Sequence, residues 1–146
     1  ATPSTQALIS LGKTQLLSAD EAKRLKTGVL FMSYFLMSTR AFSARCAELG
    51  VDASPAATAF ARSHTSQYDK ASEVIGENGL NADLVWTFYS GQLAELAGRH
   101  IDQYAQHDRI DAVEVCRTLA KAPDRFVERR DFARLYPTLN AELMSE

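Results

Sequence analysis

The densest run of apolar positions in the chain covers residues 29–37, which are apolar on every face of a helix apart from Ser33. A helix that is hydrophobic all round normally lies inside a protein, with neighbours on several sides. Ser18 and Glu21 have the spacing of a capping box, and Gly50 can adopt the left-handed conformation that ends a helix. The pattern predicts a central buried helix over residues 19–49, covered by other helices or by a dimer interface.

The rest of the chain alternates helical spacing with residues that start or stop helices. Ser54, Asn81 and Asp111 are suited to cap helix N-termini, and Pro123 is suited to begin a helix. The predicted further helices cover residues 55–75, 82–106 and 112–121, a stretch from 123 through 136, and residues 138–144. We expect an all-α fold: a single-domain bundle of about five to six helices over residues 18–146, after a loosely ordered N-terminal segment at 1–17.

Two glycines interrupt the predicted helix over residues 82–106. Gly91 and Gly98 are seven positions apart and therefore share a face. Glycine inside a helix costs about 1 kcal/mol relative to alanine, so a compensating reason is expected. We interpret the pair as a place where another helix packs closely, with close approach of a ligand as the alternative.

Composition agrees with the helical pattern. The 146 residues include four prolines and seven glycines, and 46% of them are hydrophobic. Alternating β-branched runs are absent from the sequence, which favours helices over strands. The net charge of −2 gives no general bias toward nucleic acid or membranes. The apolar centre at 29–37 is shorter than the roughly 20 residues that span a bilayer, so we expect no transmembrane segment.

Two cysteines bear on the compartment. Cys46 and Cys116 can form a disulfide, which would indicate an exported, oxidising location. The alternative is two separately buried thiols in a cytosolic protein. The chain begins Ala1-Thr2 without an initiator methionine, which is consistent with a removed signal peptide or with trimming. We expect a bacterial periplasmic or secreted protein with a disulfide.

The residues that usually carry chemistry are not arranged as a known motif. His100 and His107 lie two helical turns apart, about 10 Å along the axis, which is too far for one ion. His64 on an alanine-rich stripe is interpreted as a hydrogen-bonded core or boundary residue. Neither a nucleophile elbow nor a glycine-rich phosphate loop occurs in the sequence. We therefore expect no enzyme activity, metal or cofactor.

Basic residues gather near the C-terminus. Arginine makes bidentate contacts with carboxylates and is common at protein interfaces. The default interpretation is a solvated, salt-bridged face, and the alternative is a site for an acidic protein partner rather than for nucleic acid. The candidate partner-binding residues are Arg125, Arg129, Arg130 and Arg134.

Two short stretches carry a resemblance. The run from Arg45 to Asp52, followed by a helix that begins with proline, and the later run from Glu114 to Arg117 resemble small exported helical proteins of proteobacteria. Most of those proteins have no assigned role. Some similar disulfide-bearing periplasmic proteins are immunity proteins that block secreted toxins, with type VI secretion immunity proteins as a more distant resemblance. The resemblance implies an exported helical protein that acts by binding.

Two functions are therefore expected. The first is a non-enzymatic protein that acts through protein–protein binding, as an adaptor, inhibitor or immunity-like protein, and that forms a homodimer through spare apolar surface of the central helix. The second is a carrier of a small hydrophobic ligand or lipid, with a pocket between helices. The candidate pocket residues are Met32, Phe35, Phe42, Phe60, Phe88 and Tyr89.

Overall fold

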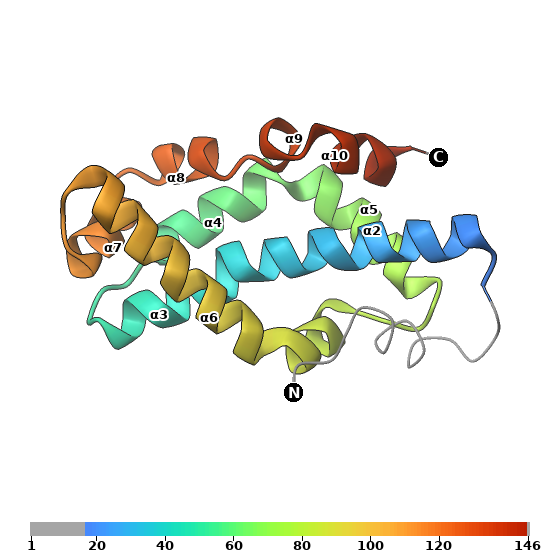
Figure 1. Cartoon of the computed structure of the whole chain (residues 1–146), viewed down its shortest axis with the longest axis horizontal. Coiled ribbons are helices and arrows are strands. Elements are labelled where there is room, and N and C mark those ends of the chain that lie inside the picture. Colours follow the sequence, from blue (N-terminus) through green and yellow to red (C-terminus); the bar gives the residue numbers. More distant parts are fainter. Residues whose placement is uncertain (1–16, 146) are drawn as a thin grey trace.

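A continuous helical rod runs through the middle of the protein (Figure 1). It consists of α2 (Ala19–Leu36), a π-helical turn η1 (Met37–Ala41) and α3 (Phe42–Glu48). The computed structural model describes residues 17–145, so the expected N-terminal segment, apart from Leu17, lies outside the described residues. The central helix predicted over residues 19–49 is confirmed.

Both ends of the rod form as the sequence predicts. The backbone N–H of Glu21 donates to Ser18 Oγ at 3.1 Å, and the N–H of Ser18 donates to Glu21 Oε1 at 3.2 Å. At the other end Gly50 has a φ of +80°, and the N–H of Val51 bonds to the carbonyl of Cys46 at 2.9 Å. These local bonds satisfy backbone groups that the helix ends leave without partners.

The middle of the rod, between Leu25 and Phe42, is mostly buried. Leu25, Phe31 and Met32 are fully buried, and Leu30 is the large apolar residue of α2 that remains 38% exposed. Burying a leucine or phenylalanine side chain contributes about 1.5–3 kcal/mol, so the apolar stretch holds the surrounding helices to the rod.

The segment predicted as one helix over residues 55–75 is two helices, α4 (Ser54–Ser63) and α5 (Thr65–Gly76). The break lies at His64, whose φ of −116° and ψ of 24° are not helical. The buried His64 ring accepts a hydrogen bond from the backbone N–H of Phe132, so a contact with a distant segment accompanies the break. Helix α5 packs along α2, and α4 packs on η1 and α8.

The next two helices match their predicted starts. Helix α6 (Ala82–Asp108) is capped by the Asn81 side chain and ends two residues later than predicted. Arg109 follows it in the left-handed conformation, with a φ of 57°. Helix α7 (Ala112–Lys121) has the predicted bounds, and the Asp111 side chain accepts from the N–H of Glu114.

The predicted close helix packing at the two glycines of α6 is wrong, whereas the alternative of a ligand stays a prediction. A Cβ atom built on Gly91 or Gly98 would meet no atom of residues 17–145 within 4 Å, so neither glycine permits a close contact with another described helix. The close contact occurs at Gly28 instead, where a Cβ would lie 3.0 Å from Val74 Cγ1 and 3.2 Å from Ile75 Cγ2 of α5. Gly28 therefore sets how closely α2 and α5 approach.

The C-terminal part consists of α8 (Pro123–Arg129), α9 (Phe132–Leu135) and α10 (Pro137–Met144), which lie along α4 and α5 at the edge of the molecule shown at the top of Figure 1. The helix predicted to continue from 123 through 136 is interrupted at Arg130, and the Asp131 side chain then caps α9. Within residues 17–145 the fold is a single all-α domain that contains no strand.

The two cysteines form a disulfide. Cys46 of α3 and Cys116 of α7 are bonded, with their Cα atoms 5.5 Å apart. The bond closes a loop with a sequence separation of 70, which is worth about 4 kcal/mol in the chain-entropy model. The pairing indicates an oxidising compartment.

Within residues 17–145 no helix combines the length and the apolar character that crossing a membrane requires.

Candidate functional site

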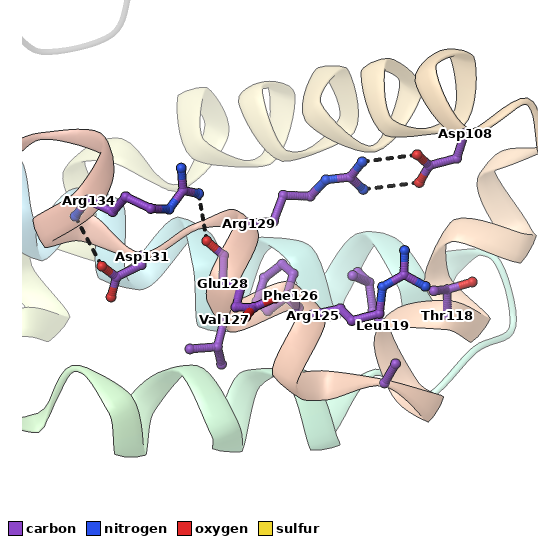
Figure 2. Close-up of a pocket in the computed structure, with 11 residues that line it drawn as sticks. Asp108, Thr118, Leu119, Arg125, Phe126, Val127, Glu128, Arg129, Asp131 and Arg134 are labelled. Atoms are coloured by element: carbon purple, nitrogen blue, oxygen red, sulfur yellow. Dashed lines mark hydrogen bonds and ion pairs between the residues drawn. The ribbon is translucent and has the colours of Figure 1, made fainter.

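A hollow of about 560 Å³ lies at the surface where α7 and α8 meet the end of α6 (Figure 2). We call it the arginine hollow. Three of the four arginines predicted to bind a partner line it: Arg125, Arg129 and Arg134. The structure thus brings these three residues together around one concavity, although they belong to α8 and α9.

Two of these arginines are held in place. Arg129 makes a bidentate pair with Asp108 of α6, at 3.1 Å from Nη1 to Oδ2 and 3.0 Å from Nη2 to Oδ1. The same guanidinium lies over the Tyr104 ring, 4.3 Å from its centroid. Arg134 donates from Nη2 to the carbonyl of Glu128 at 2.6 Å. Both side chains are therefore already oriented before anything binds.

Hydrogen bonds from two neighbouring side chains favour the charged form of Asp108. Hydrogen bonds from the Arg129 and His107 side chains lower the pKa of Asp108 from 3.8 to about 2. These bonds favour the charged carboxylate, because they would be lost if it were protonated. Asp108 was not among the predicted site residues, and its place at the end of α6 gave no sign that it would meet α8.

Arg125 differs from the other two. Among residues 17–145 no hydrogen bond or ion pair joins its guanidinium to another group. In Figure 2 the side chain extends in the direction of Thr118, which also lines the hollow. The floor beside it is apolar and includes the buried side chains of Leu119 and Phe126. Arg125 thus offers its donors at the edge of an apolar depression.

Arg130 does not belong with the arginines that were predicted to bind a partner. It was grouped with the exposed arginines, but its side chain is only 2% exposed and lies inside the protein. Nε donates to Ser38 Oγ at 2.9 Å, and Nη1 donates to His100 Nδ1 at 2.9 Å and to the Tyr104 hydroxyl at 3.1 Å. An arginine in this position cannot reach a partner at the surface.

Within the described part of the chain, residues 17–145, the Arg130 guanidinium lies against aromatic rings and forms no ion pair with a carboxylate. Its guanidinium carbon lies 4.7 Å from the Tyr34 ring centroid and 4.6 Å from that of Phe42. No ion pair to it is found within residues 17–145, and Nη2 has no hydrogen-bond partner there. Burial raises the pKa of the Tyr34 hydroxyl, which stays protonated and donates to the Arg130 carbonyl at 2.7 Å. Cation–π contacts and neutral acceptors replace the counter-ion.

The π-helical turn η1 contributes to this interior cluster. Ser38, one of its residues, is buried and receives the bond from Arg130. Single π-turns inside α-helices are frequent at functional positions, because they change the direction in which side chains point. The sequence pattern did not predict this interior cluster. The one available signal was the four-residue spacing of Phe126 and Arg130, which places both on one helix face.

The interpretation of His64 as a hydrogen-bonded core residue is confirmed, since its ring is fully buried and bonded on both nitrogens. Among residues 17–145 no group of three His, Cys, Asp or Glu side chains is placed to hold a metal ion.

The six candidate pocket residues pack into the core or against it. Met32, Phe42, Phe60 and Tyr89 are buried, and Phe35 and Phe88 are half-buried beside them. None of the six lines the arginine hollow or the small hollow of about 50 Å³ between α2 and α5. The homodimer stays a prediction.

Fold and site together define an all-α, disulfide-linked domain with an arginine-lined surface hollow. Neither the protein-family models, nor the curated proteins, nor the solved structures contain a match to this chain.

Proposed function

We propose that this chain is a non-enzymatic binding protein of the bacterial periplasm or of the secreted fraction, which docks another protein at the arginine hollow. An adaptor, an inhibitor or an immunity-like protein would act in this way. The compartment is supported by the Cys46–Cys116 bond, which persists where thiols are not kept reduced.

The single observation that carries the docking site is Arg125, whose guanidinium has no partner among residues 17–145 and lies beside an apolar floor. Its neighbours Arg129 and Arg134 are fixed by bonds within the chain, whereas the donors of Arg125 are available. Arginine is enriched among the residues that dominate binding energy at protein interfaces, especially beside well-packed apolar contacts.

The charges around the hollow favour a protein over a small anion. Three arginines face three carboxylates, those of Asp108, Glu128 and Asp131, so the lining has no net charge. A free anion would gain little from such a site. A peptide segment with one apolar side chain for the floor and one carboxylate for Arg125 would use both features. The volume of about 560 Å³ is sufficient for such side chains.

The test begins with a photocrosslinking amino acid at Glu128, which lines the hollow, and at Glu73 on α5 as the control position. Crosslinking in the oxidising compartment of the native host identifies the partner, which is then purified. The affinity of the purified partner is measured for the unsubstituted chain, for Arg125→Glu and for Arg62→Glu. Arg62 is a matched control because it is an exposed arginine of α4 with no ion pair in the described residues.

Arg125→Glu should weaken binding by about tenfold or more, the size typical of an interface residue that dominates binding. Arg62→Glu should leave the affinity within about twofold. Crosslinks from Glu73 but not from Glu128, or equal affinities of the two variants, would contradict the proposal.

A further inference from the structure

One buried and one half-buried histidine form hydrogen bonds with the same short segment. The segment runs from Arg130 to Phe132, which covers the connection between α8 and α9 and the first residue of α9. His64, at the break between α4 and α5, contacts its backbone, and His100 of α6 contacts its arginine side chain. Neither histidine lines the arginine hollow, but Asp131 of the connection does.

The hydrogen bonds of His64 fix its protonation. The backbone N–H of Phe132 donates to Nε2 at 3.0 Å, so Nε2 carries no proton. Nδ1 lies 3.1 Å from the carbonyl of Phe60 and 2.7 Å from Ser63 Oγ, and it donates to that carbonyl. The ring is therefore neutral, with its proton on Nδ1. A proton on Nε2 would abolish the bond to Phe132.

His100 is fixed in the same way by a different donor. Arg130 Nη1 lies 2.9 Å from His100 Nδ1, and a guanidinium only donates, so Nδ1 accepts. His100 is neutral with its proton on Nε2. A second proton on Nδ1 would place two cations in contact, and no carboxylate among residues 17–145 forms an ion pair with either of them.

We propose that His64 and His100 form an acid-sensitive latch, which holds the α8–α9 connection while both rings are neutral and loosens it when they bind protons.

Burial favours the neutral form of each ring, although the Phe60 carbonyl and Asp131 act in the opposite direction on His64. His64 faces Asp131, whose Oδ1 is 3.6 Å from Nε2, and Arg130 on the connection, and it stacks on Phe31 of α2. Burial lowers the pKa of His64, and this effect outweighs the opposing charge of Asp131. His100 faces Arg130, with Phe42 of α3 and Tyr104 of its own helix beside it. Burial and the Arg130 charge lower the pKa of His100.

The sign of the pH effect follows from these directions. Both rings bind protons less readily when the connection is closed than when it is open, where the ordinary pKa is about 6.5. The closed form is therefore fully favoured above about pH 6.5 and loses its advantage as the pH falls toward the lowered values. Each ring can change the opening equilibrium by up to about tenfold per pH unit, and both together by up to about a hundredfold.

Opening would alter the arginine hollow, because Glu128, Arg129, Asp131 and Arg134 flank Arg130 in sequence and line it. Helix α7 would stay attached to α3 through the disulfide. Acid release of a docked partner rests on the proposed function, whereas the latch itself is a property of the chain alone.

Amide hydrogen exchange followed by NMR tests the latch on the full chain without a partner. The Phe132 amide is the reporter, since it donates directly to His64. The control is the Leu84 amide, which donates at 2.9 Å to the Asn81 side chain, an acceptor that does not titrate. Between pH 7.5 and 5.0, after correction for intrinsic exchange, protection at Phe132 should fall by about tenfold or more relative to Leu84. Equal losses at the two amides would overturn the latch.

A variant separates the contribution of His100 from that of His64. In His100→Gln the amide oxygen can accept from Arg130 without titrating, so the pH-dependent loss at Phe132 should shrink to at most about tenfold per pH unit. An unchanged loss would overturn the role of His100. If this variant does not fold, ring-nitrogen NMR of the unsubstituted chain decides the question. Either ring titrating at or above pH 6.5, or carrying the opposite tautomer, overturns the latch.

The outcomes are distinguishable from those for the docking site. An intact latch with equal affinities of Arg125→Glu and Arg62→Glu would remove the proposed function alone. A normal effect of Arg125→Glu with a pH-independent Phe132 amide would remove the latch alone.

Discussion

Arg129 and Arg130 are adjacent in the sequence but lie in opposite environments. Arg129 lines the surface hollow and pairs with a carboxylate, Asp108. Arg130 is buried between two aromatic rings and bonds only to neutral acceptors. Arg129 is the last residue of α8, and Arg130 follows it outside helical geometry with a φ of −117°, so one side chain lies at the surface and the other in the core.

The difference shows what each arginine can do. At the surface, a charged partner fixes the geometry of Arg129, and water solvates whatever remains, so charge is available for recognition. In the interior, the cation of Arg130 disfavours a proton on its neighbour His100 and needs aromatic faces to replace hydration. The surface cluster is suited to binding, and the interior cluster makes the structure sensitive to protons.

The largest effect should come from removing the bond that supports both clusters. Cys46 lies one turn after Phe42, which packs on Arg130, and Cys116 lies three residues before Leu119 of the hollow. Replacing both cysteines with alanine should lower the free energy of unfolding by about 4 kcal/mol. Urea unfolding followed by circular dichroism measures this, and a loss below about 1 kcal/mol would contradict the stabilising role of the bond.

The contribution of the interior cluster to stability should depend more on the volume of the Arg130 side chain than on its charge. Arg130→Ala leaves a cavity between Tyr34 and Phe42 and should cost about 3 kcal/mol, as for other large buried side chains. Arg130→Met fills most of the space without a buried charge and should restore about half or more of the loss. Equal unfolding free energies for the two variants would show that the charge itself is what the core requires.

Glycines outside both clusters provide reference changes in the free energy of unfolding. Gly91→Ala and Gly98→Ala should each stabilise the protein by up to about 1 kcal/mol, because α6 has space for a Cβ at both positions. Gly28→Val is the contrasting change, since the contact with Val74 leaves no room, and it should destabilise the protein. Thermal unfolding of the three variants checks the signs, and destabilisation by Gly91→Ala would be the contrary result.

The smallest effect on stability is expected from the surface pair of Arg129 and Asp108. Arg129→Gln removes the main cause of the lowered pKa of Asp108, which should rise from about 2 toward 3.8. The folded pKa of Asp108 lies below its unfolded value, so the pair contributes stability above about pH 4 and loses it as the pH falls toward 2. Carboxyl-carbon NMR titration measures the shift, with His107→Gln as the control for the second hydrogen bond. An unchanged pKa in Arg129→Gln would contradict the assigned cause.

Elements set by neighbouring residues were predicted well. The bounds of α7 and the starts of α2 and α6 follow from Asp111, Ser18 and Asn81, each of which bonds to an amide three residues away. The gathering of Arg125, Arg129 and Arg134 was also visible as a basic stretch. The pairing of Asp108 with Arg129 was not visible in the sequence, because only the tertiary fold brings α6 and α8 together.

By itself the sequence determined the helical class, the central buried helix and most helix ends, since capping and apolar spacing act within one or two turns. Tertiary structure alone decided that the cysteines pair, that the helix after Ser54 breaks at His64 and that Arg130 is interior. The bonds responsible join residues 68 positions apart for His64 and Phe132, and 92 apart for Ser38 and Arg130. Whether a polar side chain is buried depends on such distant acceptors, which local spacing does not specify.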